Sequence, residues 1–303
     1  MITVSATPPL TVELSVTRVE VTAGQTVQLW LRLTAERPLT VRGATVELST
    51  RLTYLHKEGG LYAGRSIARA RRTEVRATQE VPGPWPIQPG ELITLPVAVQ
   101  VPPDAPGTTH VPVVEITWWV TARVRVADFA PAEVSRSFVV LSRAADLLGV
   151  AFEPVTGNDR RCARVSIEDL PSRFLAPGCA LSGTVAIRPL RRCAIRGVRL
   201  ELAVRQKVHH GEWIGDDPTR NPAYQELEQD LVVAGSRLSG PTVLEPADPV
   251  RTPFRLILPE DLPAASLVTP NFTLSWLLRA VVDRRLRPDP YVEVPLHART
   301  TRD

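Results

Sequence analysis

The segment with the most potential metal ligands lies in the second half of the chain, and it contains His209, His210, Glu212, Trp213, Asp216 and Asp217. Imidazole and carboxylate groups are ligands that zinc and related metals accept. Neighbouring residues of a strand point to opposite faces, however, so the two adjacent histidines would not easily share one ion. Because the spacing also matches no zinc motif, we interpret the segment as an exposed hairpin loop and expect no metal and no cofactor.

The three cysteines offer the other reactive groups. Cys162, Cys179 and Cys193 form no CxxC pair, and their odd number argues against a disulfide framework. We expect them to be small, unpaired and partly buried, which favours a reducing, cytoplasmic compartment. The first residues, MITVSATPPLTVEL, lack the basic and apolar regions of a signal peptide, and no apolar run is long enough to span a membrane.

Motifs of catalysis and nucleotide binding are not visible. The sequence contains no GxSxG, P-loop, GxGxxG or HExxH pattern. The glycine-rich residues 59–65, GGLYAGR, fall in a predicted loop without the strand-to-helix context of a phosphate loop. Since an enzyme needs converging titratable groups, we predict a protein that is not an enzyme.

Arginine forms the strongest local concentration of charge. The long segment 54–90 carries a run broken by one glutamate, and the run comprises Arg65, Arg69, Arg71, Arg72 and Arg76. One interpretation is a solvated hairpin. The other is a surface that meets acidic proteins, phosphorylated segments or membrane headgroups. We take these arginines as candidate partner-binding residues, because the corresponding segment 206–240 is mixed in sign and divergent loops often carry binding specificity.

Two tryptophans extend this candidate surface. Trp85, in GPWP, and Trp213, in GEW, fall in predicted loops, and exposed tryptophan is enriched at binding hot spots. Trp118 and Trp276 instead occupy equivalent positions of predicted strands, where packing is the expected use.

Strands must position all of these residues, because apolar and polar residues alternate along much of the chain. Val27, Leu29, Leu31 and Leu33 are one example, and a period of two places one face of a strand on a core. The 29 prolines among 303 residues fit many short strands. With 44% apolar and 22% charged residues, the composition predicts a globular, all-β protein.

The strand pattern occurs twice. Residues 24–48 align without a gap with residues 178–202, at an offset of 154. Two further blocks follow in the same order, and they pair residues 97–106 with 254–263 and residues 115–126 with 273–284. Three ordered matches indicate an internal duplication. We therefore predict two tandem antiparallel β-sandwiches, over residues 1–145 and 146–303.

Short motifs within these blocks add a family resemblance. They are Pro177-Gly178 followed by Leu181, Gly183, Val185 and Ile187; Ile195, Gly197 and Leu200-Glu201-Leu202; Leu258-Pro259, Leu262-Pro263 and Ser266; and the strand Leu274–Asp283. With them the sequence resembles the arrestin-like superfamily, which includes arrestins, trafficking adaptors and bacterial sporulation-control proteins. The resemblance implies two immunoglobulin-like, arrestin-type sandwiches that form a scaffold. No match to the charged cluster or phosphate-sensing lysines of receptor-binding arrestins is found, so receptor desensitisation is not implied.

These observations favour a cytoplasmic, non-catalytic scaffold or adaptor. It would bind protein partners, with an acidic or phosphorylated surface, through loops, concave faces or edge strands. The alternative is a membrane-surface or cell-envelope module that binds anionic ligands peripherally, through the same arginines. An extracellular carbohydrate-binding sandwich is disfavoured by the unpaired cysteines and missing signal peptide. Nucleic-acid binding is disfavoured by a net charge of only +4.

Overall fold

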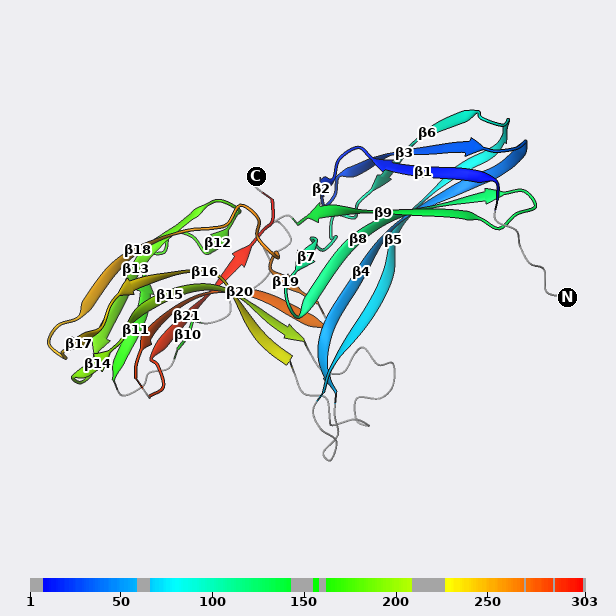
Figure 1. The fold of residues 1–303 in the computed structure, drawn as a ribbon. Coiled ribbons are helices and arrows are strands. Elements are labelled where there is room, and N and C mark those ends of the chain that lie inside the picture. Colours follow the sequence, from blue (N-terminus) through cyan, green and yellow to red (C-terminus); the bar gives the residue numbers. More distant parts are fainter. Residues whose placement is uncertain are drawn as a thin grey trace. The chain divides into compact units, whose positions relative to one another are not determined.

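The computed structural model describes residues 8–58, 66–142, 155–157, 162–208, 227–269, 271–285 and 287–301. Every element of regular secondary structure in these residues is a β-strand, which confirms the predicted all-β class (Figure 1). Within these ranges there is accordingly no helix with the length and apolar character needed to cross a membrane.

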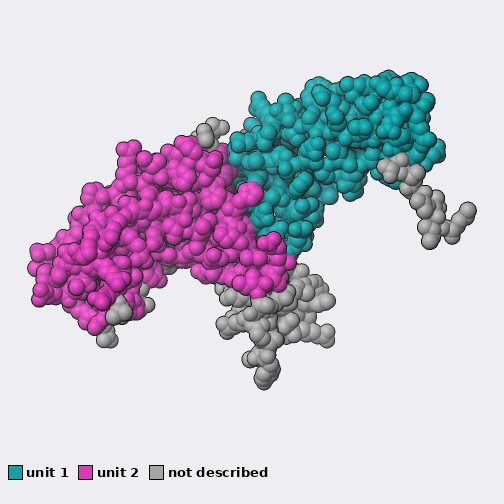
Figure 2. Space-filling view, viewed as in Figure 1, with its two compact units in different colours: residues 1–53, 70–109, 115–142 teal, residues 54–69, 110–114, 143–303 magenta. Residues whose placement is uncertain are grey.

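The chain divides into two compact units, shown in different colours in Figure 2. The first comprises residues 1–53, 70–109 and 115–142, and the second comprises residues 54–69, 110–114 and 143–303. The predicted boundary between residues 145 and 146 falls outside the described residues.

The first unit is built on two sheets whose strands are β1 (Leu10–Val16), β2 (Glu20–Thr22), β3 (Thr26–Ala35), β4 (Leu39–Glu58), β5 (Ser66–Ile87), β6 (Leu92–Gln100), β7 (Thr109–His110), β8 (Val114–Val126) and β9 (Ala132–Leu141). Most of their residues belong to this unit, whereas residues 54–58, 66–69, 110 and 114 of these strands are assigned to the second unit. One sheet has the order β1-β3-β6, and the other has the order β2-β9-β8-β4-β5 with β7 beside β8. Buried side chains of both sheets form one core. Residues of β3 show the expected alternation, since Val27, Leu29, Leu31 and Leu33 are all buried and the intervening residues are more exposed.

The second unit repeats this arrangement with β10 (Thr156–Gly157), β11 (Ala163–Glu168), β12 (Phe174–Leu175), β13 (Ala180–Pro189), β14 (Cys193–Ile195), β15 (Gly197–Val208), β16 (Leu227–Ser239), β17 (Thr242–Leu244), β18 (Val250–Ile257), β19 (Leu267–Val268), β20 (Phe272–Asp283) and β21 (Tyr291–Ala298). Its sheets have the orders β11-β13-β18 and β10-β21-β20-β15-β16, and β14 pairs with β17. The series β9-β8-β4-β5 of the first unit thus matches β21-β20-β15-β16.

Hydrogen bonds confirm the match in detail. The indole nitrogen of Trp118 donates to the carbonyl of Pro106, 12 residues earlier, at 2.9 Å. That of Trp276 donates to the carbonyl of Ala264, also 12 residues earlier, at 3.2 Å. Both tryptophans are fully buried, so each indole N–H needs such a partner. The packing role predicted for the two tryptophans is therefore correct.

Equivalent glycines allow the neighbouring strands to approach. Gly43 on β4 has a φ of 148°, and Gly197 at the start of β15 has a φ of 155°. A Cβ atom at either position would crowd the next strand's backbone, at the carbonyl of Val81 and of Ser239 respectively. Both the backbone conformation and the space therefore require glycine.

Candidate functional site

The described part of the arginine run lies on β5, at the outer edge of the larger sheet of the first unit. Arg69, Arg71, Arg72 and Arg76 are exposed there. Arg65 lies outside the described residues. The described part of the run, for which a solvated hairpin and an anion-facing surface were the two interpretations, is thus displayed along a strand of 22 residues.

The strand divides these arginines between two environments. Glu74 forms ion pairs with Arg72 at 2.8 Å and with Arg76 at 2.6 Å. Arg69 and Arg71 form no ion pair with any other described residue. Their positions alternate with that of Arg72, so the pleat directs them to the other face of β5.

The outer edge of β5 pairs with no described strand. Pro82, Pro84 and Pro86 occupy alternate positions near its C-terminal end, and proline has no N–H for strand pairing. Residues 66–80 contain no proline, and they form the part of this edge that could accept another strand. Trp85, between the prolines, lies on β5 and packs partly buried against the core of the first unit, so its predicted place in a loop is wrong. Its contact with a partner stays a prediction.

A charged network on the second unit was not predicted from the sequence. It joins four strands of the larger sheet through Asp230 on β16, Arg205 on β15, Arg279 on β20 and Glu293 on β21. Arg205 Nε lies 3.0 Å from Asp230 Oδ1, and its Nη2 lies 2.9 Å from Glu293 Oε1. Arg279 Nε lies 2.7 Å from Glu293 Oε1, and Arg279 also contacts Asp230.

Burial and pairing determine the ionisation of this network. Burial alone would raise the pKa of Asp230 and of Glu293, but hydrogen bonds and charges from Arg205 and Arg279 outweigh it and hold both pKa values below their ordinary range. The side chain of Glu293 is only 7% exposed. Because each charge has partners of opposite sign, we assign the network to stability and not to ligand binding.

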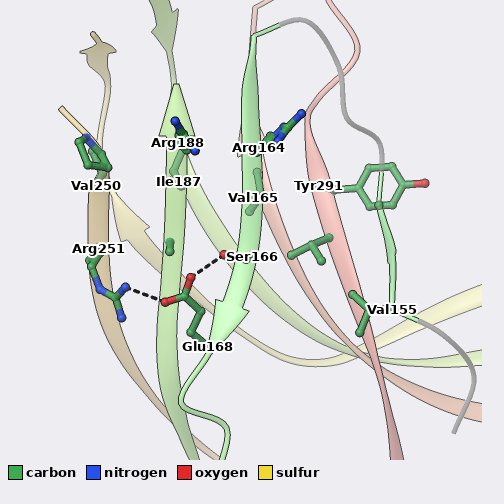
Figure 3. Close-up of a pocket in the computed structure, with 14 residues that line it drawn as sticks. Val155, Arg164, Val165, Ser166, Glu168, Ile187, Arg188, Val250, Arg251 and Tyr291 are labelled. Atoms are coloured by element: carbon green, nitrogen blue, oxygen red, sulfur yellow. Dashed lines mark hydrogen bonds and ion pairs between the residues drawn. The ribbon is translucent and has the colours of Figure 1, made fainter. Parts of the chain in front are cut away.

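A groove with a volume of about 620 Å³ lies elsewhere on the second unit (Figure 3). Strands β11, β13 and β18 of the smaller sheet line it, together with β10 and β21 of the larger one. Most of its lining is aliphatic, with contributions from Val155, Val165, Ile187, Val250 and Val292.

The charged residues of the groove are unequal in number. The described residues that line it include Arg164, Arg188 and Arg251 and one carboxylate, that of Glu168. Arg251 forms an ion pair with Glu168 at 2.7 Å, and the Ser166 hydroxyl donates to the same carboxylate at 2.9 Å, as the dashed lines in Figure 3 show. Among the described lining residues, arginine thus outnumbers glutamate.

A disulfide in the second unit corrects the prediction for the cysteines. Cys162 and Cys193 are bonded to each other across 31 residues, while Cys179 is free and exposed. The expectation of three unpaired cysteines is wrong because an odd number leaves room for one pair and one free thiol. One of the arguments for a reducing compartment is lost with it.

The candidate metal segment at residues 209–217 lies outside the described residues, and so does Trp213. In the part of the chain that is described, no group of three or more histidine, cysteine, aspartate or glutamate side chains could hold a metal ion.

No protein-family model matches the chain, and no curated protein matches it by sequence. Among solved structures, the chain is similar to Spo0M, a sporulation control protein from Bacillus subtilis, with 16% identity and a TM-score of 0.38. The similarity covers 61% of this chain and 69% of that one. The fold itself rests on the two pairs of sheets described above, and we take nothing about function from this similarity.

Proposed function

We propose that the chain is a non-catalytic binding scaffold that engages an acidic, extended segment of a partner protein along β5. The observation that carries this proposal is an edge strand of 22 residues on which Arg69 and Arg71 are exposed and unpaired among the described residues. An edge strand offers backbone N–H and C=O groups to a partner strand. The arginines add bidentate recognition of carboxylates or phosphates.

Apolar side chains on the same face support the proposal. Ile67 is 64% exposed and Val75 is 56% exposed, and both share the alternation of Arg69 and Arg71. A partner strand with acidic and apolar residues at alternate positions would place one kind of contact opposite each of these residues.

The test compares charge reversal at two places. The variant Arg69→Glu, Arg71→Glu, Arg72→Glu should bind an eight-residue peptide of alternating glutamate and valine at least about tenfold more weakly than the original chain. The control Arg18→Glu, Arg32→Glu, Arg42→Glu changes the same charge at exposed arginines of the first unit and should leave the affinity nearly unchanged. An equal loss of peptide affinity in both variants would mean that only the net charge of the chain attracts the peptide.

Methylation of alternate amide nitrogens of the peptide separates strand pairing from simple charge attraction. It removes the N–H groups that an edge needs and leaves every carboxylate in place, so binding to β5 should be lost. Undiminished binding would exclude strand addition. If the chain bound vesicles that contain anionic lipid more tightly than it bound the peptide, this result would favour the membrane-surface alternative for the same arginines.

A further inference from the structure

Three arginines gather on two adjoining turns of the second unit. Arg191 lies in the turn between β13 and β14, and Arg284 and Arg287 lie in the turn between β20 and β21. The two turns adjoin because the backbone N–H of Arg196, just before β15, donates to the carbonyl of Asp283 at the end of β20, at 2.8 Å. Burial lowers the pKa of Arg284, and repulsion from Arg287 and Arg191 lowers this pKa further. The three positive charges are thus close enough to act on one another.

The side chains of these arginines lack partners in the described part of the chain. Arg191 and Arg287 are exposed, and neither forms a hydrogen bond or an ion pair with another described residue. The Nε of Arg284 is buried and also has no hydrogen-bond partner among these residues. A buried N–H group without an acceptor is unfavourable, so the cluster would gain from an added group that accepts hydrogen bonds.

A neighbouring carboxylate offsets only part of this charge. Asp289 acts on Arg284 electrostatically and raises its pKa, but less than burial and the other arginines lower it. Its Oδ1 accepts a hydrogen bond from the backbone N–H of Arg284 at 2.8 Å, and its Oδ2 lies 3.9 Å from Nη2 of Arg199. Because Arg199 shares this aspartate, the three arginines keep an excess of positive charge.

The equivalent turns of the first unit show that the fold does not need this cluster. Arg37 corresponds to Arg191 at the offset of 154. Phe129 corresponds to Arg287, because the register of β8 with β9 equals that of β20 with β21 after an offset of 158. The guanidinium of Arg37 lies over the ring of Phe129, at 5.1 Å from its centroid, which is a favourable contact. The second unit thus has another cation at the position where the first unit has the aromatic ring.

We propose that Arg191, Arg284 and Arg287 bind a small, doubly charged oxyanion. Guanidinium groups suit such a ligand, because each can bind an oxyanion through two parallel hydrogen bonds. The ligand would supply the acceptor that the buried Nε of Arg284 lacks, and its two charges would offset the repulsion within the cluster. The proposal concerns the second unit and does not depend on binding along β5.

Four probes test the charge of the proposed ligand. At about pH 8, propyl phosphate and malonate are dianions, whereas dimethyl phosphate and acetate are their singly charged counterparts. Calorimetric titration of the full chain should show at least about tenfold tighter binding of one or both dianions than of the counterpart. The stronger dianion identifies a phosphate or a dicarboxylate as the preferred group. Equal binding of the singly charged probes, or no binding of either dianion at roughly 1 mM, would overturn the proposal.

Variants locate the binding. Arg191→Gln should weaken binding of the preferred dianion about tenfold, because one charge-assisted pair of hydrogen bonds is lost. Arg287→Phe gives the second unit the pairing of Arg37 with Phe129 and should weaken the binding by a similar factor. The control Arg255→Gln removes an exposed arginine on β18 of the same unit and should leave the affinity unchanged.

Thermal unfolding would verify that the three variants remain folded. It also provides a second measure of binding, because a saturating dianion should raise the Tm of the original chain and of Arg255→Gln more than that of Arg287→Phe. The proposal fails if Arg191→Gln or Arg287→Phe is folded and binds the dianion as tightly as the original chain. It also fails if the Arg255→Gln control loses as much affinity as Arg191→Gln.

Discussion

The two units share a framework and differ in how they carry charge on it. On the larger sheet of the first unit, Arg123 pairs with Glu133 and Arg125 with Glu80, and the two arginine side chains are 52% and 49% exposed. In the second unit the side chains of Arg205 and Arg279 are 25% and 19% exposed within a connected network. Exposed pairs contribute little to stability, whereas buried ones become costly when one partner is removed.

One pair of equivalent residues shows the difference most directly. Arg51 and Arg205 are separated by the offset of 154 and follow equivalent glutamates, Glu47 and Glu201. Arg51 lies over the ring of Trp119 at 4.9 Å from its centroid. Arg205 instead forms ion pairs across the sheet. The sheet order, the indole hydrogen bonds and the glycines thus stayed common to both units, while the polar faces took on separate roles.

The largest expected effect concerns the disulfide, which has no counterpart in the first unit because Leu39 occupies the position of Cys193. Cys162→Ser should lower the free energy of unfolding by roughly 3–4 kcal/mol, since the bond closes a loop of about 31 residues. Chemical denaturation with hydrogen-exchange mass spectrometry should place the loss in the second unit.

Cys179→Ser is the matched control and should be close to neutral, because that thiol is free and exposed. Thiol titration of the native, oxidised protein should find one reactive group. Three reactive thiols under oxidising conditions would show that the disulfide does not form, so that neither unit is cross-linked.

The next effect compares Arg205→Met with Arg51→Met. Loss of Arg205 leaves Asp230 and Glu293 with one cation fewer in a partly buried site, and should cost roughly 3 kcal/mol. Loss of Arg51 removes a contact between a cation and an indole ring, worth less than about 1 kcal/mol. If urea denaturation showed an equal loss of unfolding free energy in both variants, the network would contribute no more than a set of exposed ion pairs.

The parts of the fold that could be predicted from the sequence are those that depend on local residue patterns. Alternation within single strands and the ordered repeat of three blocks were enough for the all-β class and the duplication, because both are properties of neighbouring residues. The arginine run was also visible, but its division by Glu74 depends on the pleat of β5. The network and the groove arise from registers that join strands far apart in the sequence. Arg205 and Glu293, for instance, are separated by 88 residues.

The same reasoning explains the missed disulfide. Cys162 and Cys193 have no motif spacing, and they become neighbours only when β11 and β14 are placed by their sheets. The arginine pair of the groove has a similar origin, since Arg164 and Arg188 are ordinary exposed residues until the register sets them opposite each other. For Arg188, a comparison of the two repeats would have been a signal, because at the offset of 154 this arginine replaces Thr34 of the first copy.

The smallest expected effect is a difference in acid sensitivity between the units. The pKa values of Asp230 and Glu293 are lowered in the folded state, so their contribution to stability is complete above the unfolded values, near pH 4, and is lost as the pH falls through the lower folded values. Hydrogen exchange at pH 3 should therefore show weakened protection of β15 and β20 relative to pH 6. In Arg205→Met this dependence on pH should be reduced, because the carboxylates keep less of the interaction that lowers their pKa.

The first unit provides the internal reference. The pKa of Glu80 is also lowered, by a hydrogen bond from Thr45 and by Arg125, but this glutamate is exposed and solvent screens its interactions. If β4 and β8 lose as much protection at pH 3 as β15 and β20, the acid response comes from the framework that both units share, and not from the network.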